Sequence, residues 1–62
     1  MCLSTVYKNE KTESAVVMKN VMRIECRDDK VILTDLMDRT LEIEGKLESA
    51  NLVDGFVIVK TN

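Results

Sequence analysis

Hydrophobic and charged residues alternate along two stretches of this chain. In residues 22–27 every second position is apolar and each position between is charged, and the same pattern holds in residues 41–44 and resumes at Leu47. A period of two is typical of a β-strand with one buried and one solvated face. Both stretches are therefore predicted to be strands of a sheet that is covered on one side.

Two continuous apolar runs indicate more deeply buried strands. Residues 31–34 and 56–59 are rich in β-branched side chains, which favour central strands covered on both faces. Residues 14–18 form a similar, weaker run, and the opening stretch 2–7 also carries strand-favouring side chains. The pattern therefore predicts six or seven short strands.

Polar links separate the predicted strands, at residues 9–12, 27–30 and 35–38. The link at 27–30 is short enough to form a hairpin. Asp54 followed by Gly55, directly before an apolar run, is the strongest hairpin signal in the chain. Gly45 interrupts an alternating stretch and is predicted to mark a bulge or a sharp bend.

These elements predict an all-β fold in which six or seven strands curl into a small barrel or a rolled antiparallel sheet. A short helix over residues 47–53 is the alternative, but Asn51 and Gly55 limit its length. The 62 residues are too few for two domains, so residues 1–62 are interpreted as one domain. A chain this short buries little apolar surface alone, so we expect a partner chain, a metal or a disulfide to stabilise it. An unpaired sheet edge would favour a homodimer.

The composition argues against several classes of function. The chain has no His, which is the commonest general base near neutral pH and the commonest metal ligand. One Tyr, one Phe and no Trp leave few rings for stacking on bases, and a net charge of −2 gives no basic surface for a phosphate backbone. We therefore expect no nucleic-acid partner. No apolar run approaches the ~20 residues of a membrane span and the start lacks a signal-peptide pattern, so we expect a cytoplasmic protein without a membrane partner.

The chain has two cysteines, Cys2 and Cys26, whose spacing excludes a zinc ribbon within one chain. Cys26 shares a predicted strand face with Met22 and Ile24. Because free cysteine behaves as a small apolar side chain, Cys26 is interpreted as a buried hydrophobic residue.

Cys2 lies beside further potential metal donors at the chain terminus. If Met1 is removed, the free amine and the Cys2 thiolate can close a five-membered chelate ring. If Met1 is retained, the donors are the Met1 amine, the Cys2 backbone nitrogen and the Cys2 sulfur. Nitrogen and sulfur donors in one plane suit Ni(II) or Cu(II). On these residues alone, packing inward at the start of a strand is the commoner role for such a cysteine.

Several segments resemble the CooT family of small nickel-binding accessory proteins. They are MCLSTVY at residues 1–7, KVILTDL at residues 30–36 and LEIEGKL at residues 41–47, followed by the apolar strand at residues 56–59. Together with the length of the chain, they extend the resemblance over nearly all of residues 1–62.

The resemblance implies a cytoplasmic, homodimeric, β-rich protein that assists nickel delivery to a client enzyme such as carbon monoxide dehydrogenase. It also implies that the nickel ligand is the cysteine directly after the initiator methionine, which is Cys2 here. With Met1 as a further source of donors, we expect one Ni(II) held between two chains by both Cys2 residues. Cys26 lies outside the opening motif and receives no ligand role.

Two other classes of function are weighed against nickel binding. An RNA-binding barrel would use the basic residues of the first half of the chain, namely Lys8, Lys11, Lys19, Arg23, Arg27 and Lys30. Nearby acidic residues make a solvated face the simpler interpretation. An enzyme would use carboxylates such as Glu42 and Glu44 or those of Asp28, Asp29, Asp35 and Asp38, but no nucleophile paired with a base is visible. We therefore do not expect an enzyme.

Overall fold

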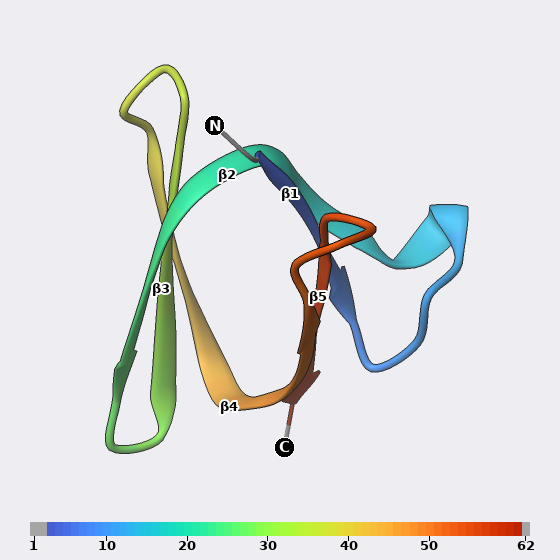
Figure 1. Ribbon diagram of the computed structural model, residues 1–62. Helices are drawn as coiled ribbons and strands as arrows, with labels where there is room; N and C mark the ends of the chain where they lie inside the picture. The colour runs from blue at the N-terminus through green and yellow to red at the C-terminus, as the bar shows by residue number, and fades with distance from the viewer. Residues whose placement is uncertain (1–2, 62) are drawn as a thin grey trace.

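The computed structural model describes residues 3–61, which form an all-β protein. The strands are β1 (Ser4–Lys8), β2 (Val16–Arg27), β3 (Lys30–Asp35), β4 (Thr40–Asn51) and β5 (Phe56–Thr61) (Figure 1). Within the described residues the single helical segment is the short 3-10 turn η1 (Glu13–Ala15), and no helix there has the length and hydrophobicity to cross a membrane. The predicted all-β class is confirmed.

Each strand is hydrogen-bonded to two neighbours, so the sheet closes into a barrel in the order β1-β2-β3-β4-β5. Closure comes from β1 and β5, which run parallel with Val6 opposite Val57. The other neighbouring pairs are antiparallel. The first and last strands of the chain therefore lie side by side (Figure 1).

The structure has five strands rather than the predicted six or seven. The runs expected at residues 14–18 and 22–27 merge into β2, and the two alternating stretches on either side of Gly45 merge into β4. Both strands are long because each passes from one partner to another without losing its hydrogen-bonded ladder. β2 pairs first with β1 and then with β3, whereas β4 pairs first with β3 and then with β5.

Asn20 marks the place where β2 changes partner. Its φ is 57°, a left-handed conformation that Asn adopts more readily than most residues. The next residue, Val21, pairs with both Ser4 of β1 and Asp35 of β3.

Gly45 marks the corresponding place in β4. Glu44 still pairs with β3, whereas Gly45 pairs with Thr61 of β5. A Cβ at position 45 would collide with the carbonyl oxygen of Lys60, so only glycine lets the two backbones approach this closely. Gly45 is therefore the place where β4 changes partner, whereas the register shift of this strand lies beyond it, between Leu47 and Ser49.

The core is a small cluster of aliphatic side chains enclosed by the sheet. It consists of Val6, Val21, Val31, Leu33, Val57 and Val59. The alternate residues Ile32 of β3 and Ile58 of β5 are only half-buried. The prediction that these two strands are covered on both faces is therefore wrong for the single chain, because one curled sheet encloses one core and adds no second layer outside it.

The predicted hairpin links are confirmed. β2 and β3 join through a tight turn at Asp28, which has a φ of 45°. In the turn between β4 and β5, Asn51 Oδ1 accepts hydrogen bonds from the N–H groups of Val53 at 3.1 Å and Asp54 at 2.9 Å, and Gly55 has a φ of 76°. The alternative prediction of a short helix over residues 47–53 is wrong, because β4 continues to Asn51.

Candidate functional site

The predicted metal donors Met1 and Cys2 lie outside the described residues, directly before Leu3. The carbonyl oxygen of Leu3 is 3.4 Å from the position that a Cβ on Gly55 would take. The Thr5 N–H donates a hydrogen bond of 3.0 Å to the carbonyl oxygen of Gly55. The chain therefore enters β1 beside the turn that joins β4 and β5.

The turn between β3 and β4 lies at the same end of the sheet. Ser4 at the start of β1 pairs with Val21, which also pairs with Asp35 at the end of β3. The Leu36 N–H donates a hydrogen bond of 2.8 Å to the carbonyl oxygen of Asn20. Figure 1 shows this turn and the start of β1 at the upper end of the molecule, opposite the β2–β3 hairpin and the end of β5.

The buried carboxylate of Asp35 organises the β3–β4 turn. Its Oδ1 accepts hydrogen bonds from the backbone N–H groups of Met37 at 3.0 Å and Arg39 at 2.9 Å, and its Oδ2 accepts one from Arg39 Nε at 2.9 Å. These donors, above all the backbone N–H of Arg39, hold the pKa of Asp35 below its ordinary value despite burial. The shape of the turn therefore rests on this carboxylate and not on the apolar residues beside it.

Four large hydrophobic side chains project from these two turns. Leu36 and Met37 in the β3–β4 turn are 51% and 73% exposed, and Leu52 and Val53 in the β4–β5 turn are 72% and 96% exposed. They are the most exposed large hydrophobic residues among those described. We call these four residues the N-terminal rim, because the start of β1 lies at the same end of the sheet.

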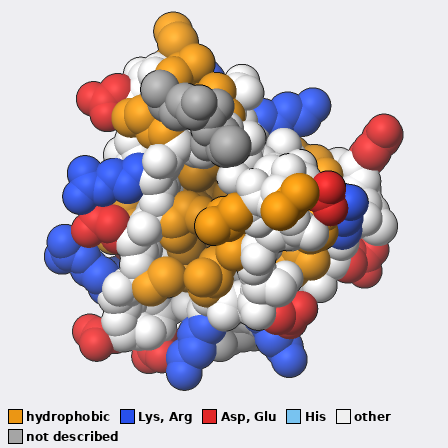
Figure 2. Space-filling model, viewed as in Figure 1, with side chains coloured by type: hydrophobic (Ala, Val, Ile, Leu, Met, Phe, Trp, Pro, Cys, Tyr) orange, Lys and Arg blue, Asp and Glu red, His pale blue; other side chains and the backbone are white. Residues whose placement is uncertain are grey.

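The hydrophobic and polar pattern did not single out the rim. It assigns Leu36 and Met37 to the link at residues 35–38, and Leu52 and Val53 to the alternative helix over residues 47–53. The signal available was a pair of adjacent apolar residues in each segment that the structure shows to be a turn, where turn chemistry favours polar residues. Figure 2 shows hydrophobic side chains gathered over the middle and upper parts of the face seen in Figure 1.

Cys26 is exposed, so the prediction that it is buried is wrong. It pairs with the fully buried Val31 of β3, but β1 pairs with β2 only from Val16 to Val21, so among the described residues the end of β2 that carries Cys26 has no second neighbouring strand. Within residues 3–61 no group of three His, Cys, Asp or Glu side chains is placed to hold a metal ion. Cys26 therefore gains no ligand role from its neighbours.

Three of the six basic side chains named for the first half of the chain contact acidic ones. Arg23 and Arg27 both contact Glu25, with N–O distances of 2.9 and 3.1 Å, and Lys30 contacts Glu42 at 3.0 Å. The contact with Glu42 raises the pKa of Lys30. This pairing is the solvated, mixed-charge face predicted as the simpler interpretation, and it lowers the positive potential available to an RNA backbone.

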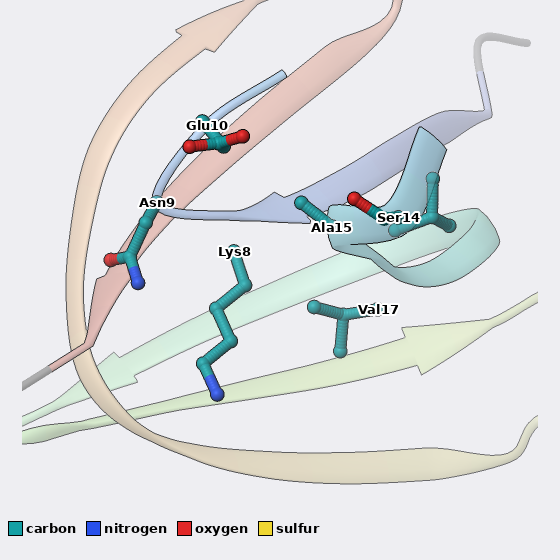
Figure 3. Close-up of a pocket in the computed structure, with 7 residues that line it drawn as sticks. Lys8, Asn9, Glu10, Ser14, Ala15 and Val17 are labelled. Carbon is teal, nitrogen blue, oxygen red and sulfur yellow. The ribbon is translucent and has the colours of Figure 1, made fainter. Parts of the chain in front are cut away.

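A shallow groove of about 340 Å³ lies at the other end of β1, where the chain turns towards β2 (Figure 3). It is lined by Lys8, Asn9, Glu10, Ser14, Ala15, Val16 and Val17. The Asn9 side chain is tied to Thr61, whose N–H donates a hydrogen bond of 2.9 Å to Asn9 Oδ1. This groove is separate from the N-terminal rim, and the sequence analysis predicted no function for it.

Comparison with known proteins identifies the family. The family model described as CO dehydrogenase accessory protein CooT matches residues 1–60. A crystal structure assigned to CooT from Carboxydothermus hydrogenoformans shares the fold, with a TM-score of 0.84, 16% sequence identity and 98% of each chain covered. No curated protein matches this chain. The chain therefore belongs to the CooT family, which is described as a family of CO dehydrogenase accessory proteins.

Proposed function

We propose that this protein binds nickel as cargo and passes it to a nickel-dependent enzyme, with carbon monoxide dehydrogenase as the client that the family description suggests. Two chains would hold one Ni(II) through their Cys2 thiolates and N-terminal nitrogen donors. The observation that carries the proposal is a cysteine directly after Met1 in a chain that matches the family model from its first residue. The protein acts in the cytoplasm as a homodimer and catalyses no reaction of its own.

The donor chemistry fits nickel. An amine or amide nitrogen and a thiolate from each terminus give a set of four donors when two termini meet, and square-planar sites with nitrogen donors suit Ni(II). The described residues 3–61 offer no cluster of metal-binding side chains, so the proposal takes its donors from Met1 and Cys2. If Met1 is excised, the donors are the amine and thiolate of Cys2 alone.

A homodimer supports both stability and metal binding in this proposal. A chain of 62 residues with six core side chains has little apolar burial of its own. A second chain adds buried surface and completes a donor set that one terminus supplies only in part. A site built from chain termini also stays near the surface, where cargo can be released to an enzyme.

The proposal is tested by nickel titration of three purified proteins: the natural chain, Cys2→Ser and Cys26→Ser. Calorimetry and native mass spectrometry would report affinity and stoichiometry together. We expect one Ni(II) per two chains for the natural protein and at least a hundredfold weaker binding for Cys2→Ser, because the thiolate is the strongest donor of the set.

Cys26→Ser is the matched control, since it removes an exposed thiol far from the N-terminal end of the sheet. It should bind nickel with the affinity and stoichiometry of the natural chain. Unchanged nickel affinity in Cys2→Ser, or a loss of binding in Cys26→Ser, would contradict the assignment of Cys2 as the ligand.

A further inference from the structure

The last part of β2 has a neighbouring strand on one side only. β2 pairs with β1 as far as Val21, whereas residues 23–27 pair with β3. Among residues 3–61, no strand pairs with the other side of residues 23–27. Figure 1 shows this part of β2 at the left-hand margin of the molecule, with β3 beside it. We call residues 23–27 the β2 edge.

The β2 edge presents backbone groups that β3 does not use. The two-residue turn at 28–29 makes Arg27 and Lys30 a hydrogen-bonded pair. Hydrogen-bonded and non-hydrogen-bonded pairs alternate along an antiparallel ladder, so the N–H and C=O groups of Ile24 and Cys26 point away from β3. In the part of the chain that the structure describes, these groups make no backbone hydrogen bond in a turn, loop or cap. They are therefore available to a further strand.

The β2 edge lacks the features with which many proteins protect the edge of a sheet. Proline, a bulge and an inward-pointing charge are common ones. Residues 23–27 contain no proline and keep a regular register with β3. Ile24 and Cys26 lie opposite the buried Leu33 and Val31 and point to the same face as these core residues, yet Ile24 is only half-buried and Cys26 is exposed. A strand added at the edge would cover both side chains.

The outward side chains of the β2 edge determine the charge of its occupant. Arg23 and Arg27 share the single carboxylate of Glu25, with N–O distances of 2.9 and 3.1 Å, which leaves one net positive charge. The two arginine side chains are 65% and 69% exposed, so each has N–H donors free for a further acceptor. A second copy of the β2 edge would bring a further positive charge, whereas an acidic segment would bring the complementary one.

We propose that the β2 edge binds an extended acidic segment of a partner protein, which adds an antiparallel strand to the sheet. The segment carries acidic side chains opposite Arg23 and Arg27 and apolar side chains opposite Ile24 and Cys26. Backbone hydrogen bonds supply the affinity in this mode of binding, and the alternate side chains supply the specificity. The inference goes beyond the proposed function, because it requires neither Ni(II) nor a particular client enzyme.

The test uses the full, metal-free chain labelled with nitrogen-15 and a synthetic peptide, Ser-Glu-Val-Thr-Val-Glu-Ser, with blocked ends. NMR spectroscopy reports which backbone amides respond. We expect the peptide to shift the amide signals of Ile24 and Cys26 and to slow their hydrogen exchange, because their N–H groups gain an acceptor. The exchange of the Glu25 amide should change less, since Glu25 forms a hydrogen-bonded pair with Ile32 of β3 already.

Two control peptides separate charge from strand pairing. A peptide with Lys in place of both Glu residues keeps the backbone but would meet Arg23 and Arg27 with like charges. A peptide that is methylated on both valine nitrogens keeps the charges but loses the N–H donors that face β2. We expect both to bind the natural chain at least about tenfold more weakly than the first peptide.

A charge-reversed variant is compared with a matched control variant. Arg23→Glu combined with Arg27→Glu should weaken binding of the Glu peptide at least about tenfold and should gain binding of the Lys peptide. Lys46→Glu combined with Lys60→Glu makes the same change in net charge at two exposed, paired residues of β4 and β5. The control variant should bind the Glu peptide within about threefold of the natural affinity. The amide spectrum of each variant establishes that it is folded, and the three peptides on the natural chain decide the question if a variant is not.

Several outcomes would overturn the inference. One is the absence of any shift at Ile24 and Cys26 at about 2 mM Glu peptide, which detects binding in the millimolar range. Equal binding of the Lys peptide or of the methylated peptide to the natural chain is another. A loss of binding in the control variant as large as in the charge-reversed variant is a third. Protection of the same two amides in concentrated natural protein without peptide would assign the β2 edge to a second copy of the chain instead.

Discussion

Gly45→Ala is the substitution for which the structure predicts the largest effect from the smallest chemical change. The added methyl group would collide with the carbonyl oxygen of Lys60 and would also lie 3.0 Å from the carbonyl carbon of Lys60 and from the Thr61 Cα. All three atoms belong to the backbone of β5, so no side chain can rotate away. The two strands must separate where β4 passes from β3 to β5.

The expected loss of stability follows from the two ways in which the chain can respond to the added methyl group. Overpacking against a rigid neighbour costs about 1–3 kcal/mol. Separation of the strands instead weakens one or two backbone hydrogen bonds, at about 1 kcal/mol each. We therefore expect Gly45→Ala to lower the free energy of unfolding by about 2–4 kcal/mol. The free energy of unfolding of a domain of this length is roughly 3–9 kcal/mol in total, so the substitution would remove a large fraction of its stability.

Thermal unfolding followed by circular dichroism measures this effect. For a domain of this size each kcal/mol shifts Tm by about 4–8 °C, so Gly45→Ala should unfold at least about 8 °C below the natural chain. Chain concentration must be the same in every sample, because dimer formation raises the apparent stability. Ser49→Ala, an exposed residue of the same strand, is the control and should change stability by less than about 0.5 kcal/mol. A Tm of Gly45→Ala within 3 °C of the natural value would refute the close approach of β4 and β5.

Three further predictions follow from the core, the β3–β4 turn and the chain terminus. Leu33→Ala removes a fully buried core side chain and should lower the free energy of unfolding by about 2–5 kcal/mol, measured by urea denaturation. A decrease below about 1 kcal/mol would show that Leu33 is not enclosed. Asp35 has a lowered pKa in the folded state, so its stabilisation is complete above the pKa of the unfolded chain and disappears as pH falls through the lower, folded pKa. The Tm difference between the natural chain and Asp35→Asn should therefore shrink when pH is lowered from 7 towards 3, and a constant difference would contradict this sign. Nickel affinity should rise between pH 6 and 9, because the terminal amine and the Cys2 thiol must lose protons before they bind the ion, and their reference pKa values are about 8 and 8.5. Calorimetric titration at several pH values measures this rise. An affinity that does not change with pH would show that neither group is a ligand.

Local sequence signals predicted the features of this fold that local chemistry determines. The alternation in residues 22–27 and 41–44 indicated strands because side chains of a strand point to alternate faces. The tight turn at residues 28–29 and the turn at Asp54 and Gly55 were predicted because Asp and Gly accept the backbone conformations that these turns need. Gly45 was predicted as a bend because a glycine inside a strand often marks a close backbone approach.

Features that depend on distant parts of the chain were not predicted. β2 continues through Asn20 because β3 takes over the pairing from β1, and nothing near residue 20 in the sequence shows which strand comes next. Cys26 has the spacing of a buried residue but is exposed, because its end of β2 pairs with β3 alone and β1 does not reach it. Met1 and Cys2 lie outside the described residues, so the ligand role proposed for them rests on the family match and their chemistry.

The proposed nickel site depends on contact between two chains. An ion with ligands on both chains stabilises the pair by mass action, and reciprocity requires the pair to bind that ion more tightly than a single chain does. A substitution that weakens the proposed dimer would therefore weaken nickel binding in dilute protein by up to the same factor, even where the substituted residue is no ligand. In the same way, a client enzyme that separated the two chains would weaken the binding of the ion. Delivery of the ion would then be coupled to docking on the client.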